Sequence, residues 1–411
     1  MTQSLIWSPI SGGITAPIGF QAAGLSAGLK PSGKPDLSLL LAPDDAVCAG
    51  TFTTSVVRAA CVDLCADRLQ VTSGRVRAVV TNSGQANAFT GDRGLVDSMR
   101  ITQAVADRLG LSADQVLICS TGVIGVPIVI DPLLAAVDPL VSGLGPDGGA
   151  AAALAILTAD LVEKQIALEA ELGGRRGRIG GMAKGSGMIH PNMATMLGYL
   201  TCDVAVPCDL WQAMVQRAVD RSFNSITVDG DTSTNDTFLA FAAGDGLPTD
   251  QLEMLEEGVT MVAQHLARSI ARDGEGATCL MEVQVEGTDS EKDARQIART
   301  ICGSSLVKTA VHGRDPNWGR IVAAAGRAGV AFSADAVALW IGPHQLMSAG
   351  QPLLFDRAAA SAYLSERACG GYLVDDTVRI RLSLGDGAGE GIAWGCDLSD
   401  QYVRINADYT T

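Results

Sequence analysis

The chain has 411 residues and a formal net charge of −15 at neutral pH, from 45 acidic and 30 basic side chains. This acidic balance argues against nucleic-acid binding, which requires basic surface, and favours an ordinary solvated acidic exterior. Hydrophobic residues make up 47% of the chain and aromatic residues 4%, which predicts a compact α/β protein rather than a disordered one.

Membrane, secretion and metal signals are absent from the sequence. No run of 18 apolar residues occurs, and residues 1–7 have no basic region ahead of an apolar core. The ten cysteines and four histidines are scattered, without a Cys-x-x-Cys pair, which supports neither a zinc site nor a disulfide framework. We therefore expect a cytoplasmic protein with buried, reduced thiols and no membrane partner.

The first part of the chain reads as strands alternating with helices. Short apolar runs predict strands at 36–42, 49–54, 76–84 and 116–119. A helix is expected over 94–109, with one face formed by Leu95, Met99, Ile101 and Val105. Neither Gly-x-Gly-x-x-Gly nor a Gly-Lys-Ser/Thr loop occurs among the early glycines, so nucleotide binding is not expected there.

Before residue 190, two features each have two interpretations, and two further segments have one. Residues 120–125, Ser-Thr-Gly-Val-Ile-Gly, follow a predicted strand and are either turn chemistry or an oxyanion hole. An Ala-rich helix is expected over 148–160, followed by a polar surface turn over 171–178. Lys184 is either a solvated lysine or a cation beside a site.

The stretch 184–203 combines a glycine-rich loop with a predicted buried strand over 193–204. Thr195 lies at the junction, preceded by the small residue Ala194. A threonine at the start of a strand is usually a β-former whose hydroxyl is satisfied locally. The pattern alone therefore favours a structural role for this hydroxyl.

After this stretch, helices are expected at 210–222, 251–270 and 290–302, and strands at 281–285, 378–384, 391–397 and 402–405. The segment 224–236 begins like a calcium loop, but Thr234 replaces the required glycine and Ala240 the final glutamate, which rejects an EF-hand. Ser305-x-x-Lys308 matches a penicillin-binding motif, but its companion motifs are missing.

Residues 184–197, Lys-Gly-Ser-Gly-Met-Ile-x-Pro-Asn-Met-Ala-Thr-Met-Leu, resemble the self-cleavage segment of the ornithine acetyltransferase family, the ArgJ-type glutamate N-acetyltransferases. At least six segments between Gly12 and Thr411 are similar to the family pattern, in the family's order. Val228, Cys279, His312 and Arg314 depart from it. Cys279 replaces a lysine often found there, which leaves the local charge balance open.

The resemblance implies a four-layer αββα sandwich of the ornithine acetyltransferase and aminopeptidase-esterase type. It also implies self-cleavage between Ala194 and Thr195, giving an alpha chain of residues 1–194 and a beta chain of residues 195–411. The chemistry explains the threonine, because cleavage creates an α-amine with a pKa of about 7.7–8 that can take the proton of its own hydroxyl. Thr195 is then both nucleophile and base.

The remaining site residues are carried over by the same resemblance. Thr121 and Gly122 correspond to the oxyanion hole. The positions that correspond to substrate contacts are Thr158, Lys184, Thr195, Glu275, Asn406 and Thr411. The segment 224–236 is interpreted as polar structure that lines or supports the site.

The implied activity is acetyl transfer from N2-acetyl-L-ornithine to L-glutamate, by a ping-pong mechanism, in arginine biosynthesis. No cofactor is implied, although acetyl-CoA remains open as a co-substrate, and the implied assembly is a heterotetramer of two alpha and two beta chains. Two alternatives remain open: a hydrolase on the same fold, in which water replaces glutamate, and an uncleaved relative that only binds ligands.

Overall fold

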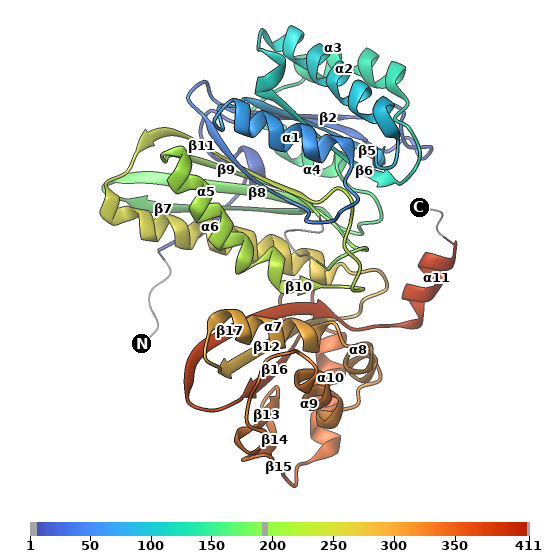
Figure 1. Ribbon diagram of the computed structural model, residues 1–411, viewed down its shortest axis with the longest axis vertical. Coiled ribbons are helices and arrows are strands. Elements are labelled where there is room, and N and C mark those ends of the chain that lie inside the picture. Colours follow the sequence, from blue (N-terminus) through green and yellow to red (C-terminus); the bar gives the residue numbers. More distant parts are fainter. Residues whose placement is uncertain (1–5, 191–195, 409–411) are drawn as a thin grey trace.

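The structure of the protein is a computed structural model that describes residues 6–190 and 196–408 (Figure 1). The strands of this part of the chain form sheets of four, six and seven strands. The four- and six-stranded sheets belong to the sandwich that the family resemblance implies, and the seven-stranded sheet belongs to a C-terminal unit below it in Figure 1.

The four-stranded sheet has the order β2-β3-β5-β6. Its strands are β2 (Gln21–Leu25), β3 (Leu37–Leu41), β5 (Ala78–Gln85) and β6 (Val116–Val123). The helices on its outer face are α1 (Ala60–Val71), α2 (Gly91–Leu109) and α3 (Ile130–Ser142). The parallel β5–β6 pair places the polar ends of both strands at one edge of the sheet, next to the six-stranded sheet.

The six-stranded sheet has the order β1-β7-β8-β9-β11-β4. Its strands are β1 (Ser8–Ile10), β7 (Lys164–Leu172), β8 (Arg175–Lys184), β9 (Leu197–Ala205), β11 (Thr237–Gly246) and β4 (Val47–Phe52). The helices α5 (Cys208–Asp220) and α6 (Leu252–Arg272) cover the face that points away from the first sheet (Figure 1).

The two sheets pack face to face, which gives the predicted αββα order of layers. Their shared core joins Leu40 and Val79 of one sheet to Phe241 of the other, with the short helix α4 (Gly149–Ala155) at its side. Inside this core the Thr81 hydroxyl and the Tyr199 hydroxyl are 2.7 Å apart and hydrogen-bonded, which satisfies two buried polar groups at once.

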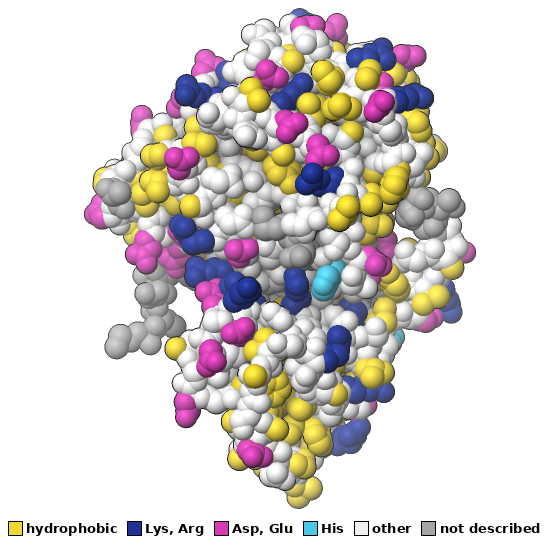
Figure 2. All heavy atoms as spheres, in the orientation of Figure 1, with side chains coloured by type: hydrophobic (Ala, Val, Ile, Leu, Met, Phe, Trp, Pro, Cys, Tyr) yellow, Lys and Arg dark blue, Asp and Glu magenta, His cyan; other side chains and the backbone are white. Residues whose placement is uncertain are grey.

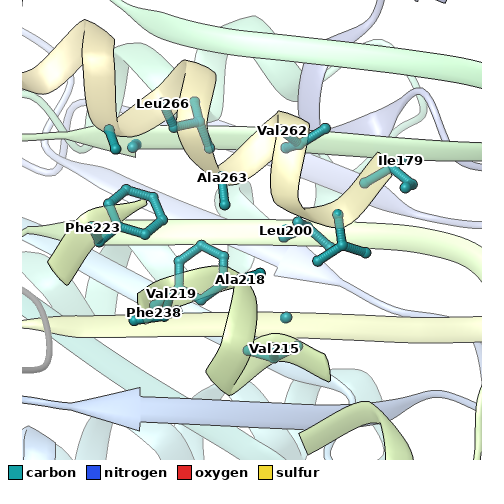
Figure 3. Packing of buried hydrophobic residues seen from close by; sticks show 14 of the residues in the cluster. Ile179, Leu200, Val215, Ala218, Val219, Phe223, Phe238, Val262, Ala263 and Leu266 are labelled. Atoms are coloured by element: carbon teal, nitrogen blue, oxygen red, sulfur yellow. The ribbon is translucent and has the colours of Figure 1, made fainter. Parts of the chain in front are cut away.

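The outer layer on the six-stranded sheet shows why these helices form. Helix α6 has apolar residues at helical spacing, and Val262, Ala263 and Leu266 pack towards the strand residues Ile179 and Leu200 (Figure 3). Each fully buried Val or Leu of this stripe contributes about 1.5–3 kcal/mol relative to an exposed position.

Helix α5 buries a second stripe on the same sheet. Val215 and Val219 lie beside Phe223 and Phe238, whose ring centroids are 5.0 Å apart (Figure 3). Tertiary packing therefore stabilises both helices beyond their intrinsic helix propensity.

The C-terminal unit is a seven-stranded mixed sheet in the order β10-β17-β12-β16-β13-β14-β15. Its strands are β10 (Ile226–Thr227), β12 (Leu280–Gly287), β13 (Ala338–Ile341), β14 (His344–Ser348), β15 (Gln351–Pro352), β16 (Thr377–Ser383) and β17 (Gly387–Cys396). Its helices are α7 (Glu291–Cys302), α8 (Ser305–His312), α9 (Trp318–Gly326) and α10 (Arg357–Ala368). The unit has a core of its own.

Several sequence predictions need correction. Residues 402–405 are not a strand but part of the helix α11 (Asp400–Asp408). The predicted turn at 120–125 begins later, because β6 continues to Val123. On α2, Ile101 and Val105 are buried as expected, whereas Leu95 and Met99 are exposed, because at about 100° per residue they lie on another side of the helix, outside the core that contains Ile101 and Val105.

None of the helices in the described part of the chain combines the length and apolar character that a membrane span needs. On the face shown in Figure 2, acidic and basic side chains are interspersed, and no broad basic patch is present there.

Candidate active site

A cavity of about 190 Å³ lies where the ends of the central strands meet the C-terminal helix. Its wall is formed by the ends of β6 and β8, the start of β9, the loop after α4, the loop after α6, the segment 229–236 and α11. These elements come from both sides of the predicted cleavage point.

The cavity brings together all the predicted site residues that the structure describes. These are Thr121, Gly122, Thr158, Lys184, Glu275 and Asn406. Ala194, Thr195 and Thr411 lie outside the described residues. Met196, which follows Thr195 directly in the chain, lines the cavity.

The end of β6 supplies Thr121 and Gly122. Gly122 has a φ of +132°, and a Cβ there would lie 2.3 Å from the carbonyl carbon of Gly84 on the neighbouring strand. Only glycine fits this backbone, so the close approach of β5 and β6 at the cavity depends on residue 122. The Thr121 hydroxyl accepts a hydrogen bond from Lys184 Nζ over 3.2 Å.

Lys184 is the last residue of β8 and points its ammonium into the cavity wall. Burial lowers the pKa of Lys184, while the nearby carboxylates of Asp160, Asp236 and Glu275 oppose this shift. Lys184 is thus a desolvated side chain in the cavity wall rather than a solvated lysine, which corresponds to the second of its two sequence interpretations.

Glu275 lies in the loop that follows α6, opposite the glycine-rich loop. Its backbone N–H donates to Ser186 O over 3.1 Å, and its carboxylate accepts a hydrogen bond of 2.7 Å from Asn406 Nδ2. Burial raises the pKa of Glu275, while the bond from Asn406 opposes this shift. Gly187 packs directly on the carboxylate, since a Cβ at 187 would lie 2.7 Å from it.

The segment 224–236 lines the cavity and orders its loops, as expected. The Asp229 carboxylate accepts hydrogen bonds from the N–H groups of Met188 (2.6 Å) and Ile189 (2.9 Å). Asn235 Nδ2 donates to the carbonyl oxygens of Ala86 and Ser120 at the ends of β5 and β6. These bonds connect the beta-chain segment to both walls.

Sequence reasoning missed some residues of the wall and its support. Tyr402 lines the cavity, and its only signal was its helical spacing of four from Asn406. Asp160, Lys164 and Asp273 form a buried ionic cluster behind the wall, described below. No spacing rule could join them, because Asp273 is 109 residues from Lys164.

Cys279 replaces a lysine that is often found at this position in the family pattern. In the structure, Cys279 belongs to the core of the C-terminal unit rather than to the cavity wall. Among the described residues, no group of three or more His, Cys, Asp or Glu side chains is arranged to hold a metal ion.

A sequence model described as the ArgJ family matches residues 21–411. The chain belongs to the ArgJ family. "Arginine biosynthesis bifunctional protein ArgJ" of Prochlorococcus marinus strain MIT 9313 is 72% identical over 99% of this chain and 95% of its own length. The protein of the same name from Parasynechococcus marenigrum strain WH8102 is 69% identical over 98% of this chain and 97% of its own length.

A solved structure of an ornithine acetyltransferase of Mycobacterium tuberculosis, complexed with ornithine, is 43% identical to this chain. It covers 46% of this chain and 100% of the solved chain, with a TM-score of 0.43.

Proposed function

We propose that this ArgJ protein transfers the acetyl group of N2-acetyl-L-ornithine to L-glutamate, after cleaving itself between Ala194 and Thr195. The observation that carries the proposal is the cavity: its wall combines Thr121 and Gly122, Lys184 and Glu275 with Met196, the neighbour of Thr195. Family membership over residues 21–411 supports the same activity.

The proposed first half-reaction forms an acetyl-enzyme. Cleavage gives Thr195 a free α-amine with a pKa of about 7.7–8, which takes the proton as Oγ attacks the acetyl carbonyl. The bond from the acetyl carbon to the ornithine nitrogen then breaks, and the α-ammonium returns the proton to that nitrogen. Backbone N–H groups at Thr121 and Gly122 would stabilise the oxyanion by roughly 3–4 kcal/mol per donor.

The charges in the wall suit an amino-acid substrate. Lys184 would bind the α-carboxylate, and Glu275 would bind the side-chain ammonium of ornithine. Asn406 holds the Glu275 carboxylate in place through its hydrogen bond of 2.7 Å. Ordering of both charged groups before the substrate arrives lowers the cost of binding.

In the proposed second half-reaction the amine of glutamate attacks the acetyl-threonine, which releases N-acetylglutamate and restores the Thr195 hydroxyl. Acetyl-CoA is proposed as a second acetyl donor, and the word "bifunctional" in the names of the relatives supports a second activity. We also propose a cytoplasmic enzyme in which two alpha and two beta chains assemble.

The deciding experiment compares the intact mass and the activity of wild type, Thr195→Ala and Thr195→Ser. Wild type is expected as two pieces that meet between residues 194 and 195, with acetyl transfer to glutamate. Thr195→Ala is expected to remain one chain without activity. Thr195→Ser, which keeps a hydroxyl and an α-amine, is expected to cleave and to retain part of the activity.

Acetyl transfer by uncleaved Thr195→Ala would refute the mechanism. Acetate release at an equal rate with and without glutamate would identify a hydrolase instead. Full-length wild type without either activity would favour a protein that only binds its ligand.

A further inference from the structure

Behind the cavity wall lies a buried ionic cluster of Asp160, Lys164 and Asp273. Lys164 Nζ is 2.7 Å from Asp160 Oδ1 and 2.6 Å from Asp273 Oδ2. The side chains of Asp160 and Lys164 are 0% exposed and that of Asp273 is 2% exposed. A buried cluster of this kind gives little net stability by itself, which suggests that its value lies elsewhere.

Asp160 differs from Asp273 in what else it binds. Its Oδ1 also accepts a hydrogen bond from Gly185 N over 2.6 Å, and its Oδ2 accepts one from Thr158 N over 3.0 Å. Gly185 follows Lys184, and Thr158 lines the cavity. Within the described part of the chain, the Asp273 carboxylate accepts a hydrogen bond from Leu161 N in addition to the one from Lys164, and it bonds no backbone group of Thr158 or Gly185.

The charges around Lys184 come from several elements. Asp160, Asp236 and Glu275 favour its charged form, whereas Lys164 and Lys30 oppose it. Asp160 exerts the largest of the favourable effects, and only burial acts more strongly on the pKa of Lys184.

We propose that Asp160 is a positioning residue of the substrate cavity. It holds the backbone at Thr158 and Gly185, and it supplies the negative charge that keeps Lys184 a cation able to bind a substrate carboxylate. This inference rests on the proposed function for its effect on catalysis, but its effect on Lys184 can be measured without any turnover.

The formal charges explain why Asp160 has this role. Asp160 is paired with Lys164 and also acts on Lys184. Without Asp160, Lys164 keeps Asp273 as its partner, whereas Lys184 keeps only the weaker effects of Asp236 and Glu275 against burial and the neighbouring ammonium groups. Lys184, the more exposed of the two lysines, then loses its proton first. The same loss frees the N–H groups of residues 158 and 185.

The test compares Asp160→Asn with the matched variant Asp273→Asn, which removes the other carboxylate partner of Lys164. Lysine side chains labelled with ¹³C at Cε are titrated by NMR, and Lys184→Arg assigns the Lys184 signal. Asp160→Asn is expected to lower the pKa of Lys184 by about one unit or more. The Asp273 carboxylate is not among the charges named above that act on Lys184. Asp273→Asn is therefore expected to change the pKa of Lys184 by less than half of the change in Asp160→Asn.

Kinetics supply the second readout. In Asp160→Asn, the rise of KM for N2-acetylornithine with pH is expected to begin about one unit lower than in wild type, with kcat changed less than KM. If Asp160→Asn does not fold, the charge-neutral double variant Asp160→Asn/Lys164→Gln replaces it. A smaller shift in the same direction is then expected, because the double variant also removes an opposing cation.

An unchanged pKa of Lys184 in the variant that lacks the Asp160 carboxylate would overturn the inference, and so would equal shifts in the Asp160 and Asp273 variants. If wild type lacks acetyl transfer, the proposed function fails, while the titration still decides whether Asp160 controls Lys184.

Discussion

At the scale of single residues, the shape of the cavity depends on two glycines, because they lack the Cβ atom that other residues carry. Gly122 lets β5 and β6 approach each other, and Gly187 lets the Glu275 carboxylate pack against the glycine-rich loop. The loop is therefore a fitted surface as well as a flexible connection. The pattern Lys-Gly-Ser-Gly predicted a loop, but the partner of each glycine could be identified only from the tertiary structure.

The first prediction concerns Gly187→Ala. A Cβ at 187 would lie 2.7 Å from the Glu275 carboxylate, so the glutamate must move away from Asn406. Because φ at 187 is not positive, alanine fits the backbone there, and the free energy of unfolding is expected to change by less than about 1 kcal/mol. The expected effect is on substrate binding, with a rise of about tenfold or more in KM for N2-acetylornithine. Gly326→Ala, where the added Cβ meets nothing within 4 Å, is the control. Wild-type kinetics of Gly187→Ala would contradict the assigned packing.

At the scale of elements, helix α11 is held in place by its base rather than by a buried face. No residue of α11 is buried, and the helix extends away from the body of the protein in Figure 1. Just before it, the Asp397 carboxylate accepts hydrogen bonds from Thr278 N and Thr278 Oγ1, both over 2.7 Å, and His312 Nδ1 lies 2.8 Å away. Ser399 Oγ donates to Gly276 O over 2.7 Å. These bonds connect the tail to the loop that carries Glu275.

The second prediction concerns Asp397→Asn. Hydrogen bonds to a buried charged group are worth about 1.5–3 kcal/mol each, so the variant is expected to lose at least about 2 kcal/mol of stability and the ordering of α11. Hydrogen exchange over residues 400–408 should accelerate, and acetyl transfer should fall about tenfold or more. Asp400→Asn, which changes a carboxylate 67% exposed, should leave both unchanged.

The pH dependence of this anchor has a definite sign. Burial would raise the pKa of Asp397, but the bonds from Thr278 and His312 outweigh it and hold the pKa below the ordinary value. The stability that Asp397 contributes is therefore complete above about pH 3.9 and is lost as the pH falls through the lower pKa of the folded state. The difference in unfolding free energy between wild type and Asp397→Asn should shrink in that acid range. A difference that grew on acidification would contradict the assignment.

The third prediction tests the tail directly. Tyr402 and Asn406 of α11 line the cavity, so a polar tag appended after Thr411 should lower acetyl transfer more than the same tag placed before Met1. The measurement is kcat/KM for the two tagged proteins. Equal, wild-type-like values would show that the tail does not build the site.

At the scale of the whole molecule, the two proposed pieces share one sheet. β8 and β9 pair as antiparallel strands on either side of the proposed cleavage point, with Lys184 opposite Leu197. β9 and β11, from the second piece, lie between β8 and β4, from the first. Cleavage would therefore remove one covalent connection and leave the hydrogen bonds of the sheet intact.

The fourth prediction follows from this arrangement. The cleaved protein should migrate as one particle in gel filtration, and its pieces should separate only in denaturant. Because unfolding then releases two chains, the denaturation midpoint of the cleaved protein should rise with protein concentration. Uncleaved Thr195→Ala, which differs by one side chain, should show no such dependence unless its oligomer dissociates. Separation of the pieces in plain buffer would contradict the shared sheet.

The sequence by itself determined what short-range physics controls. The apolar period of 251–270 predicted α6, whose Leu255, Val259 and Leu266 are all buried, because one stripe can be read within one helix. The motifs along the chain also resembled those of the ArgJ family, to which the chain belongs. That resemblance implied the sandwich fold and the six predicted site residues that line the cavity.

Only the tertiary structure decided the features that depend on distant partners. The segment 402–405 alternates like a strand, but it forms a helix, in which Tyr402 and Asn406 share a face and reach the cavity together. The cluster of Asp160, Lys164 and Asp273 joins positions more than a hundred residues apart through buried charge. Charged groups that are buried in the folded protein must be paired, because an unpaired buried charge costs free energy of desolvation. A partner that is distant in the sequence leaves no local pattern by which the pair could be predicted.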